Sequence, residues 1–143
     1  MKILSLNIAR YDFNWDERKE KIIAFIKAEE PDIVLLQEVF DDDRHNKPLH
    51  QQAKQLNDVL KFKHCIYVPV EMMLSEHQVP VDVPVFDGLA VLTNLDILDH
   101  QLLRLERASD DRHYRAIQKI VVVHDVVEYI IYNVHASNRT DLA

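Results

Sequence analysis

Cysteine and glycine are almost missing from this sequence, and their scarcity excludes several kinds of site. Cys65 is the only cysteine, so no disulfide can close within the chain and a cysteine-rich zinc site is excluded. Gly88 is the only glycine, which excludes a P-loop and the glycine-rich turn that binds dinucleotides. A chain without a disulfide is typical of a reducing compartment, so we expect a cytoplasmic protein.

Long apolar runs and an excess of basic charge are also absent. No apolar run is long enough to cross a bilayer, and the first residues, MKILSLNIARYDF, have the pattern of a strand rather than of a signal peptide. The 17 Lys and Arg residues against 24 Asp and Glu residues give a net charge of −7, which argues against a basic nucleic-acid clamp or membrane anchor. Hydrophobic residues make up 48% of the chain, which excludes disorder and predicts one domain over residues 1–143.

The residue pattern predicts an α/β fold with a mixed β-sheet of about six strands and two early helices. Alternation over residues 2–8 and an apolar run over 33–39 predict strands, and apolar residues at spacings of three and four over 16–30 predict a helix between them. A second helix is expected over 49–60, followed by a strand, a long loop over 71–87 and four more strands. These later strands are expected at 62–70, 88–93, 97–105, 114–123 and 128–134, the last two forming a hairpin that turns near Asp125.

Three of these strands are apolar at consecutive positions, in the segments IVLL, LAVL and IVVV. Such strands are buried on both faces. The two early helices can cover only one face of a sheet, and the chain has little left to cover the other. We therefore expect further protein on that second face.

Polar residues stand at the ends of apolar strands, which is where α/β sheets usually place a site. Asn7 ends the first strand and Glu38 ends the strand over 33–39, while His135 follows Asn133 on one face of the last strand. Taken singly, each has an ordinary explanation as a turn former, a solvated strand end or a structural histidine.

Taken together, the segments LSLNIARY, PDIVLLQEVF, GLAVLTN, RAIQKIVV and YNVHAS resemble the endonuclease/exonuclease/phosphatase superfamily. This superfamily comprises metal-dependent phosphodiesterases, among them pancreatic-type deoxyribonuclease. The resemblance extends over essentially the whole chain, and PDIVLLQE is its most specific part.

The resemblance implies a site for a phosphate ester and a divalent metal. It makes Glu38 a ligand of Mg²⁺ or Mn²⁺, with Asn7 helping to position the metal or the phosphate. His135 would contact the scissile phosphate, and Arg115 would lie near it. Histidine at this point of the strand disfavours the abasic-site repair branch, while nucleic acid, phospholipid and sugar-phosphate substrates all stay open.

The family often supports this histidine with a carboxylate from the middle loop, for which Glu71 and Glu76 are candidates beside the simpler interpretation of a solvated loop. Arg112 could lie beside Arg115. The remaining histidines have no metal-binding spacing and are expected at the surface; they are His64, His77, His100, His113 and His124.

Two family motifs, Gly-Asp-x-Asn and Ser-Asp-His, do not occur in this sequence. The chain therefore resembles the N-terminal half of the family's four-layer α/β/β/α sandwich. We expect either a piece of a longer enzyme or a half-domain that pairs with a second copy, and in both cases self-association and negligible phosphodiesterase activity of the isolated chain. The alternative function is a non-catalytic interaction module that dimerises.

Overall fold

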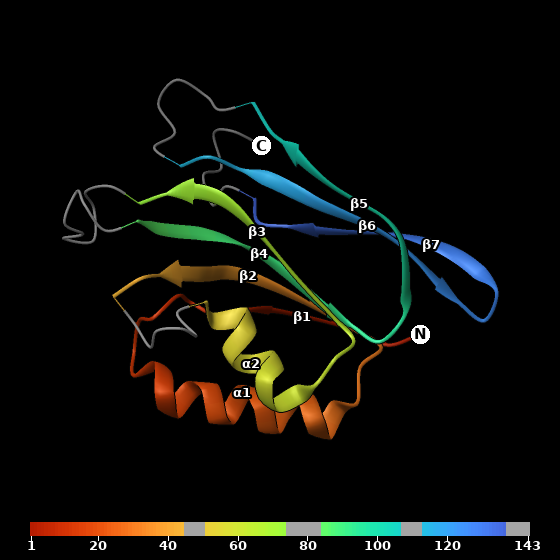
Figure 1. Cartoon of the computed structure of the whole chain (residues 1–143), viewed down its shortest axis with the longest axis horizontal. Helices are drawn as coiled ribbons and strands as arrows, with labels where there is room; N and C mark the ends of the chain where they lie inside the picture. The colour runs from red at the N-terminus through yellow and green to blue at the C-terminus, as the bar shows by residue number, and fades with distance from the viewer. Residues whose placement is uncertain (45–50, 74–83, 107–112, 137–143) are drawn as a thin grey trace.

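The N-terminal part of the chain forms a strand–helix–strand unit (Figure 1). The computed structural model describes residues 1–44, 51–73, 84–106 and 113–136. Strands β1 (Ile3–Asn7) and β2 (Ile33–Asp42) pair in parallel and are joined through α1 (Trp15–Glu29). The helix ends where Glu30 takes a left-handed conformation (φ 45°) and Pro31 follows, because proline cannot continue a helix. The first predicted helix and both of its flanking strands are confirmed.

The first sheet has the strand order β1-β2-β4-β3, in which β3 (His64–Met72) and β4 (Val85–Thr93) pair antiparallel. The second predicted helix is also present, as α2 (Gln52–Leu60). Both helices lie on one face of this sheet (Figure 1). They bury a cluster of apolar side chains against it, which includes Ile23, Ile26, Val34, Leu36, Leu56, Ala90 and Leu92.

A second sheet covers the opposite face of the first. It has the order β5-β6-β7, formed by β5 (Asp96–Arg104), β6 (Ala116–His124) and β7 (Val127–Val134). The two sheets share a second apolar cluster of Ile33, Leu35, Val91, Ile120 and Val122. The α/β class is confirmed, with seven strands in the described residues divided between two sheets. The expectation that the chain lacks material for the second face is wrong, because its own last three strands fold back over β2 and β4.

The hairpin predicted near Asp125 is confirmed. Strands β6 and β7 pair from Ile117–Val134 to His124–Val127. Asp125 and Val126 join them, with φ angles of 49° and 60°. Positive φ at both central residues is the turn geometry whose twist matches that of paired strands.

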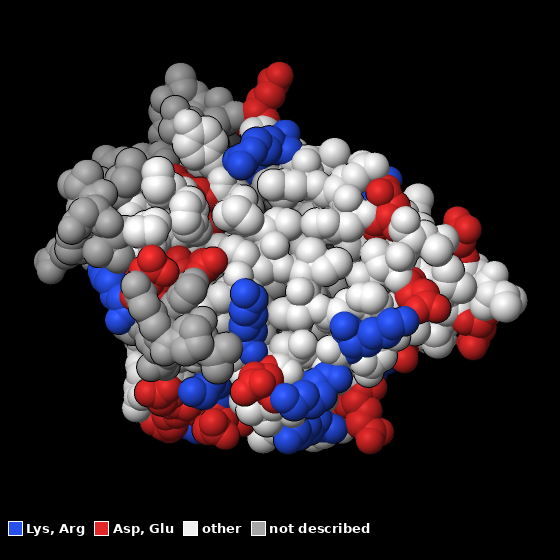
Figure 2. All heavy atoms as spheres, viewed as in Figure 1, with Lys and Arg blue, Asp and Glu red and all other residues white. Residues whose placement is uncertain are grey.

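The outer face of the second sheet is apolar and open to solvent. Five large side chains on it are 41–56% exposed: Leu98, Leu103, Ile130, Tyr132 and Val134. Figure 2 shows charged side chains along α1 and near the β6–β7 turn, and few in the middle of the view, where β3 and β5 run. Neither helix in the described part of the chain has the length and apolar character needed to cross a membrane.

The predicted loop over 71–87 is shorter than expected at both ends. Strand β3 continues to Met72 and β4 begins at Val85, while residues 74–83 lie outside the described part. Glu71 and Asp87 are therefore strand residues with fixed directions, because alternate side chains of a strand point to opposite faces.

Candidate functional site

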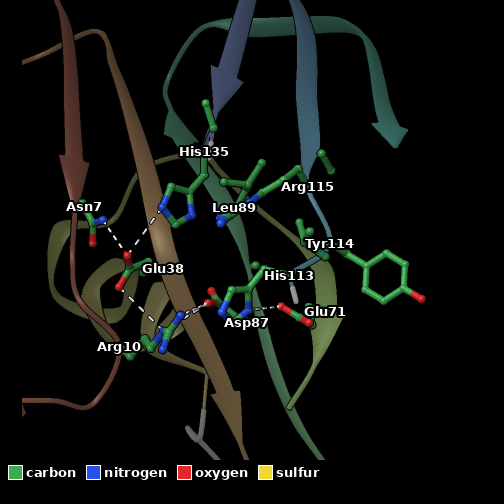
Figure 3. A pocket seen from close by; sticks show the side chains of 14 residues that line it. Asn7, Arg10, Glu38, Glu71, Asp87, Leu89, His113, Tyr114, Arg115 and His135 are labelled. Atoms are coloured by element: carbon green, nitrogen blue, oxygen red, sulfur yellow. Dashed lines mark hydrogen bonds and ion pairs between the residues drawn. The ribbon is translucent and has the colours of Figure 1, made fainter. Parts of the chain in front are cut away.

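A pocket of about 430 Å³ lies where the ends of strands from both sheets meet. Its lining includes the four residues predicted from the sequence, Asn7, Glu38, Arg115 and His135. Figure 3 shows them converging from β1, β2, the segment before β6 and the end of β7. The folded chain thus brings together side chains that are up to 128 positions apart in the sequence, counting from 7 to 135.

Glu38 occupies an irregular point of β2. The register of β2 against β4 shifts between Leu36 and Val39, and Glu38 has a φ of 51°. Non-glycine residues at positive φ are strained, and such strain and β-bulges concentrate at functional sites. The bulge turns the Glu38 carboxylate into the pocket, although its neighbours Leu36 and Val39 are fully buried.

The two oxygens of the Glu38 carboxylate have different neighbours. Oε1 accepts a hydrogen bond from the side-chain amide of Asn7 at 2.9 Å and lies 3.5 Å from Nε2 of His135. Oε2 lies 3.7 Å from Nε of Arg10. The Asn7 amide oxygen accepts the backbone N–H of Ala9 at 2.9 Å, so Asn7 here orients the carboxylate of Glu38 through its nitrogen.

His135 is half-buried between charged groups. Burial lowers its pKa below the ordinary value of 6.5, Glu38 acts in the opposite direction, and the nearby Arg115, Arg10 and His113 lower it further. A lowered pKa keeps this imidazole neutral at pH 7. In that state one ring nitrogen can donate a hydrogen bond and the other can accept one.

The sequence interpretation missed Arg10 and Asp87. Nε and a terminal nitrogen of Arg10 each lie 3.1 Å from Oδ2 of Asp87, so the guanidinium stands between Asp87 and Glu38. Burial raises the pKa of Asp87 to about 6, although Arg10 lowers it. One signal for Asp87 was available, because it precedes the only glycine within a strand.

Glu71 and His113 form a second pair in the pocket. Nδ1 of His113 lies 3.0 Å from Oε2 of Glu71, so one of the two candidate partners of His135 contacts a different histidine. The other candidate, Glu76, lies outside the described residues, as do Arg112 and His77. The expectation that His113 is an ordinary surface histidine is wrong, because it lines the pocket.

Charged side chains of both signs line the pocket. Three are acidic, Glu38, Glu71 and Asp87, and two are basic, Arg10 and Arg115. Among the described residues, no group of three or more His, Cys, Asp and Glu side chains is arranged to hold a metal ion. The predicted metal residues stay Glu38 and Asn7, whose carboxylate and amide groups carry hard oxygen donors of the kind that Mg²⁺ and Mn²⁺ prefer.

The described residues thus form a two-sheet α/β sandwich with carboxylates, arginines and histidines around one end. Residues 4–142 match the model of the Endonuclease/Exonuclease/phosphatase family, and the chain belongs to this family. The resemblance found in the sequence is thereby confirmed.

Solved structures of this family have the same fold. One is a family protein from Leptotrichia buccalis (TM-score 0.76, 16% identity, 96% of this chain and 54% of that one). Another is from Beutenbergia cavernae (TM-score 0.78, 20% identity, covering 98% of this chain and 39% of that one). A third is the catalytic domain of human Nocturnin with a bound sulfate anion (TM-score 0.67, 22% identity, covering 98% of this chain and 51% of that one). The chain thus spans 39–54% of these structures, and a comparison with curated proteins gives no match.

The raised pKa of Asp87 predicts how pH acts on an Asp87→Asn variant. Folding raises this pKa from 3.8 to about 6, so the stabilisation from the protonated carboxyl is complete below pH 3.8 and lost as pH rises through 6. The free energy of unfolding of Asp87→Asn, relative to that of the parent, should therefore rise on the order of 2 kcal/mol when the pH is raised from about 4 to about 8. Urea unfolding at both pH values measures this gain. A difference that stays constant or shrinks with rising pH contradicts the prediction.

Proposed function

We propose that this chain carries the metal-binding and phosphate-binding part of a phosphoester hydrolase that uses Mg²⁺ or Mn²⁺. The observation that supports this most directly is the strained Glu38, whose carboxylate is turned into the pocket by a bulge and oriented by Asn7. Strain of this kind persists only where the surrounding structure holds it in place.

Each residue has a separate task in this proposal. Glu38 holds the divalent cation, and the bound cation neutralises negative charge on the phosphoryl oxygens. Arg115, which also lines the pocket, adds positive charge beside the phosphate. His135 donates a hydrogen bond from its neutral imidazole to a phosphate oxygen, which stabilises the charge that develops there. Phosphodiesters and phosphomonoesters both match this chemistry, whether the phosphate belongs to a nucleic acid, a phospholipid or a sugar phosphate.

Metal binding tests the proposal on the 143-residue chain itself. Mn²⁺ added to ¹⁵N-labelled protein should broaden the amide signals of Asn7, Glu38 and His135 first, because a paramagnetic ion acts on nearby nuclei. Glu38→Gln keeps the shape of the side chain and removes its charge, and it should abolish this selective broadening. Glu20→Gln, an exposed change on α1, should leave it intact. Equal broadening in the parent and in Glu38→Gln would contradict the proposal.

The isolated chain is expected to hydrolyse a model phosphodiester negligibly, even with Mg²⁺. It spans only 39–54% of the related structures, and the two family motifs noted above are not in its sequence. Robust Mg²⁺-dependent hydrolysis by the pure chain would show that these residues suffice.

A non-catalytic interaction module is the second candidate, and the apolar outer face of β5, β6 and β7 favours it. A patch of this kind is unusual on a monomer. We propose that the isolated chain associates with a second copy through this face. The charged side chains Asp99 and Lys119 on the face pair with each other at 3.4 Å, so covering the face would not leave either charge without a partner.

Sedimentation at tens of micromolar protein should show this association. Ile130→Lys, which places a charge at a side chain that is 56% exposed, should shift the protein to a monomer. A parent that sediments as a monomer would refute the self-association. Selective Mn²⁺ binding at Glu38 would separate the enzyme from the interaction module, for which Glu38 has no role.

A further inference from the structure

Arg10 holds a fixed position in the pocket. Its guanidinium lies 5.4 Å from the centre of the Phe40 ring. Its backbone N–H donates to the carbonyl of Glu38 at 2.9 Å, and its own carbonyl accepts a hydrogen bond from the Gln52 amide at 2.6 Å. Arg10 itself has a positive φ of 53°. Both the backbone and the charged end of this residue are therefore held in place.

The guanidinium bridges two carboxylates rather than one. Asp87, only 8% exposed, holds it through contacts of 3.1 Å from two nitrogens. Glu38 lies on its other side, 3.7 Å from Nε, as Figure 3 shows. An arginine that served only to neutralise Asp87 would not need to face the Glu38 carboxylate or line the pocket.

A positive charge fixed beside Glu38 has two consequences of opposite sign. It disfavours a second cation at the same carboxylate, because like charges repel at short range. It favours an anion that enters the pocket, because an arginine forms strong, directional hydrogen bonds to phosphate oxygens.

We propose that Arg10 is the second, built-in cation of this site, which weakens metal binding at Glu38 and strengthens binding of the phosphate group. Asp87 is the positioning residue that holds its guanidinium. This inference rests on the proposed function, since it assumes that Glu38 binds a divalent cation. It adds a phosphate-binding residue that neither the sequence pattern nor the predicted set of site residues contained.

Two titrations of the 143-residue chain test the inference. In the first, Mn²⁺ affinity is measured by broadening of the Asn7 and His135 signals. In the second, the affinity for inorganic phosphate is measured by calorimetry in the presence of Mg²⁺. Arg10→Met should tighten Mn²⁺ binding on the order of tenfold and weaken phosphate binding on the order of tenfold. Arg10→Lys keeps the positive charge, and its Mn²⁺ affinity should be close to that of the parent.

The matched control is Lys21→Met, which removes one positive charge from the exposed surface of α1, where Lys21 pairs with Glu17. It should change neither affinity, which separates the local effect of Arg10 from that of net charge. In Asp87→Asn, the Nε–H signal of Arg10 should broaden through exchange with water, because its carboxylate acceptor is gone.

The opposite directions of the two affinity changes are decisive. A variant that merely loosens the pocket would weaken both ligands, and that result would overturn the inference, as would unchanged affinities in Arg10→Met. A parent chain without selective Mn²⁺ broadening would instead overturn the proposed function, and the inference with it. Selective broadening in the parent with no tightening in Arg10→Met would overturn the inference alone.

Discussion

Replacing Asn133 by leucine is expected to destabilise the protein by about 3–5 kcal/mol. Asn133 is 1% exposed and lies between the two sheets. Its amide nitrogen donates to the carbonyls of Leu36 and Ala90 at 3.0 and 3.1 Å and to the side-chain oxygen of Gln118 at 3.2 Å. Its oxygen accepts from Gln37 at 2.7 Å. Leucine fills a similar space but removes these four hydrogen bonds between buried polar groups, and their loss outweighs the added apolar contact.

Urea unfolding of the parent and of Asn133→Leu measures this loss. Gln101→Leu is the control, because Gln101 is exposed and its side chain donates a hydrogen bond to Asp99 at the surface; a change within about 0.5 kcal/mol is expected there. If Asn133→Leu were as stable as the parent, the hydrogen bonds between the sheets would contribute little to the fold.

Gly88→Ala is the second change with a large expected effect, a loss of about 3 kcal/mol or more. A Cβ atom at this position would lie 2.3 Å from the carbonyl oxygen of Val68 and 2.6 Å from Cε2 of Tyr67. Both distances are far below van der Waals contact, and the carbonyl belongs to the paired strand β3 and cannot move away cheaply. The only glycine of the chain is therefore required by the close approach of β3 to β4.

A double-mutant cycle with Tyr67→Leu separates the two clashes. Removing the ring should recover part of the stability lost in Gly88→Ala, because the contact with the Val68 carbonyl stays. Thermal unfolding of the parent, both single variants and the double variant measures this coupling. Full recovery in the double variant would mean that the ring alone excludes a larger residue.

In the segments around Asn133 and Gly88, one residue stabilises the fold and a nearby residue lies in the pocket. In the segment NVH, Asn133 fastens the two sheets together, whereas His135, two residues later on the same face, reaches the pocket. Similarly, Gly88 allows the strands to approach while its neighbour Asp87 holds Arg10. Position along the strand explains the difference, because the pocket lies at the ends of strands whose middle residues are buried in the core.

The sequence by itself determined the class of fold, most of the elements and four residues that line the pocket. Periodicity is a local property, so the helix over 16–30, the buried strands and the hairpin at Asp125 could be predicted from neighbouring residues. Glu38, Asn7, Arg115 and His135 could be selected because they stand in segments that resemble those of a family.

Only the tertiary structure decided how the strands are shared between two sheets and which side chains pair across the pocket. Sheet pairing depends on contacts between distant segments, which no local pattern contains, and therefore the second sheet was not expected over β2 and β4. Likewise, Arg10 is 77 positions from Asp87 and Glu71 is 42 from His113. A charged residue on a strand looks solvated until the fold places its partner beside it, and burial then makes that pairing necessary.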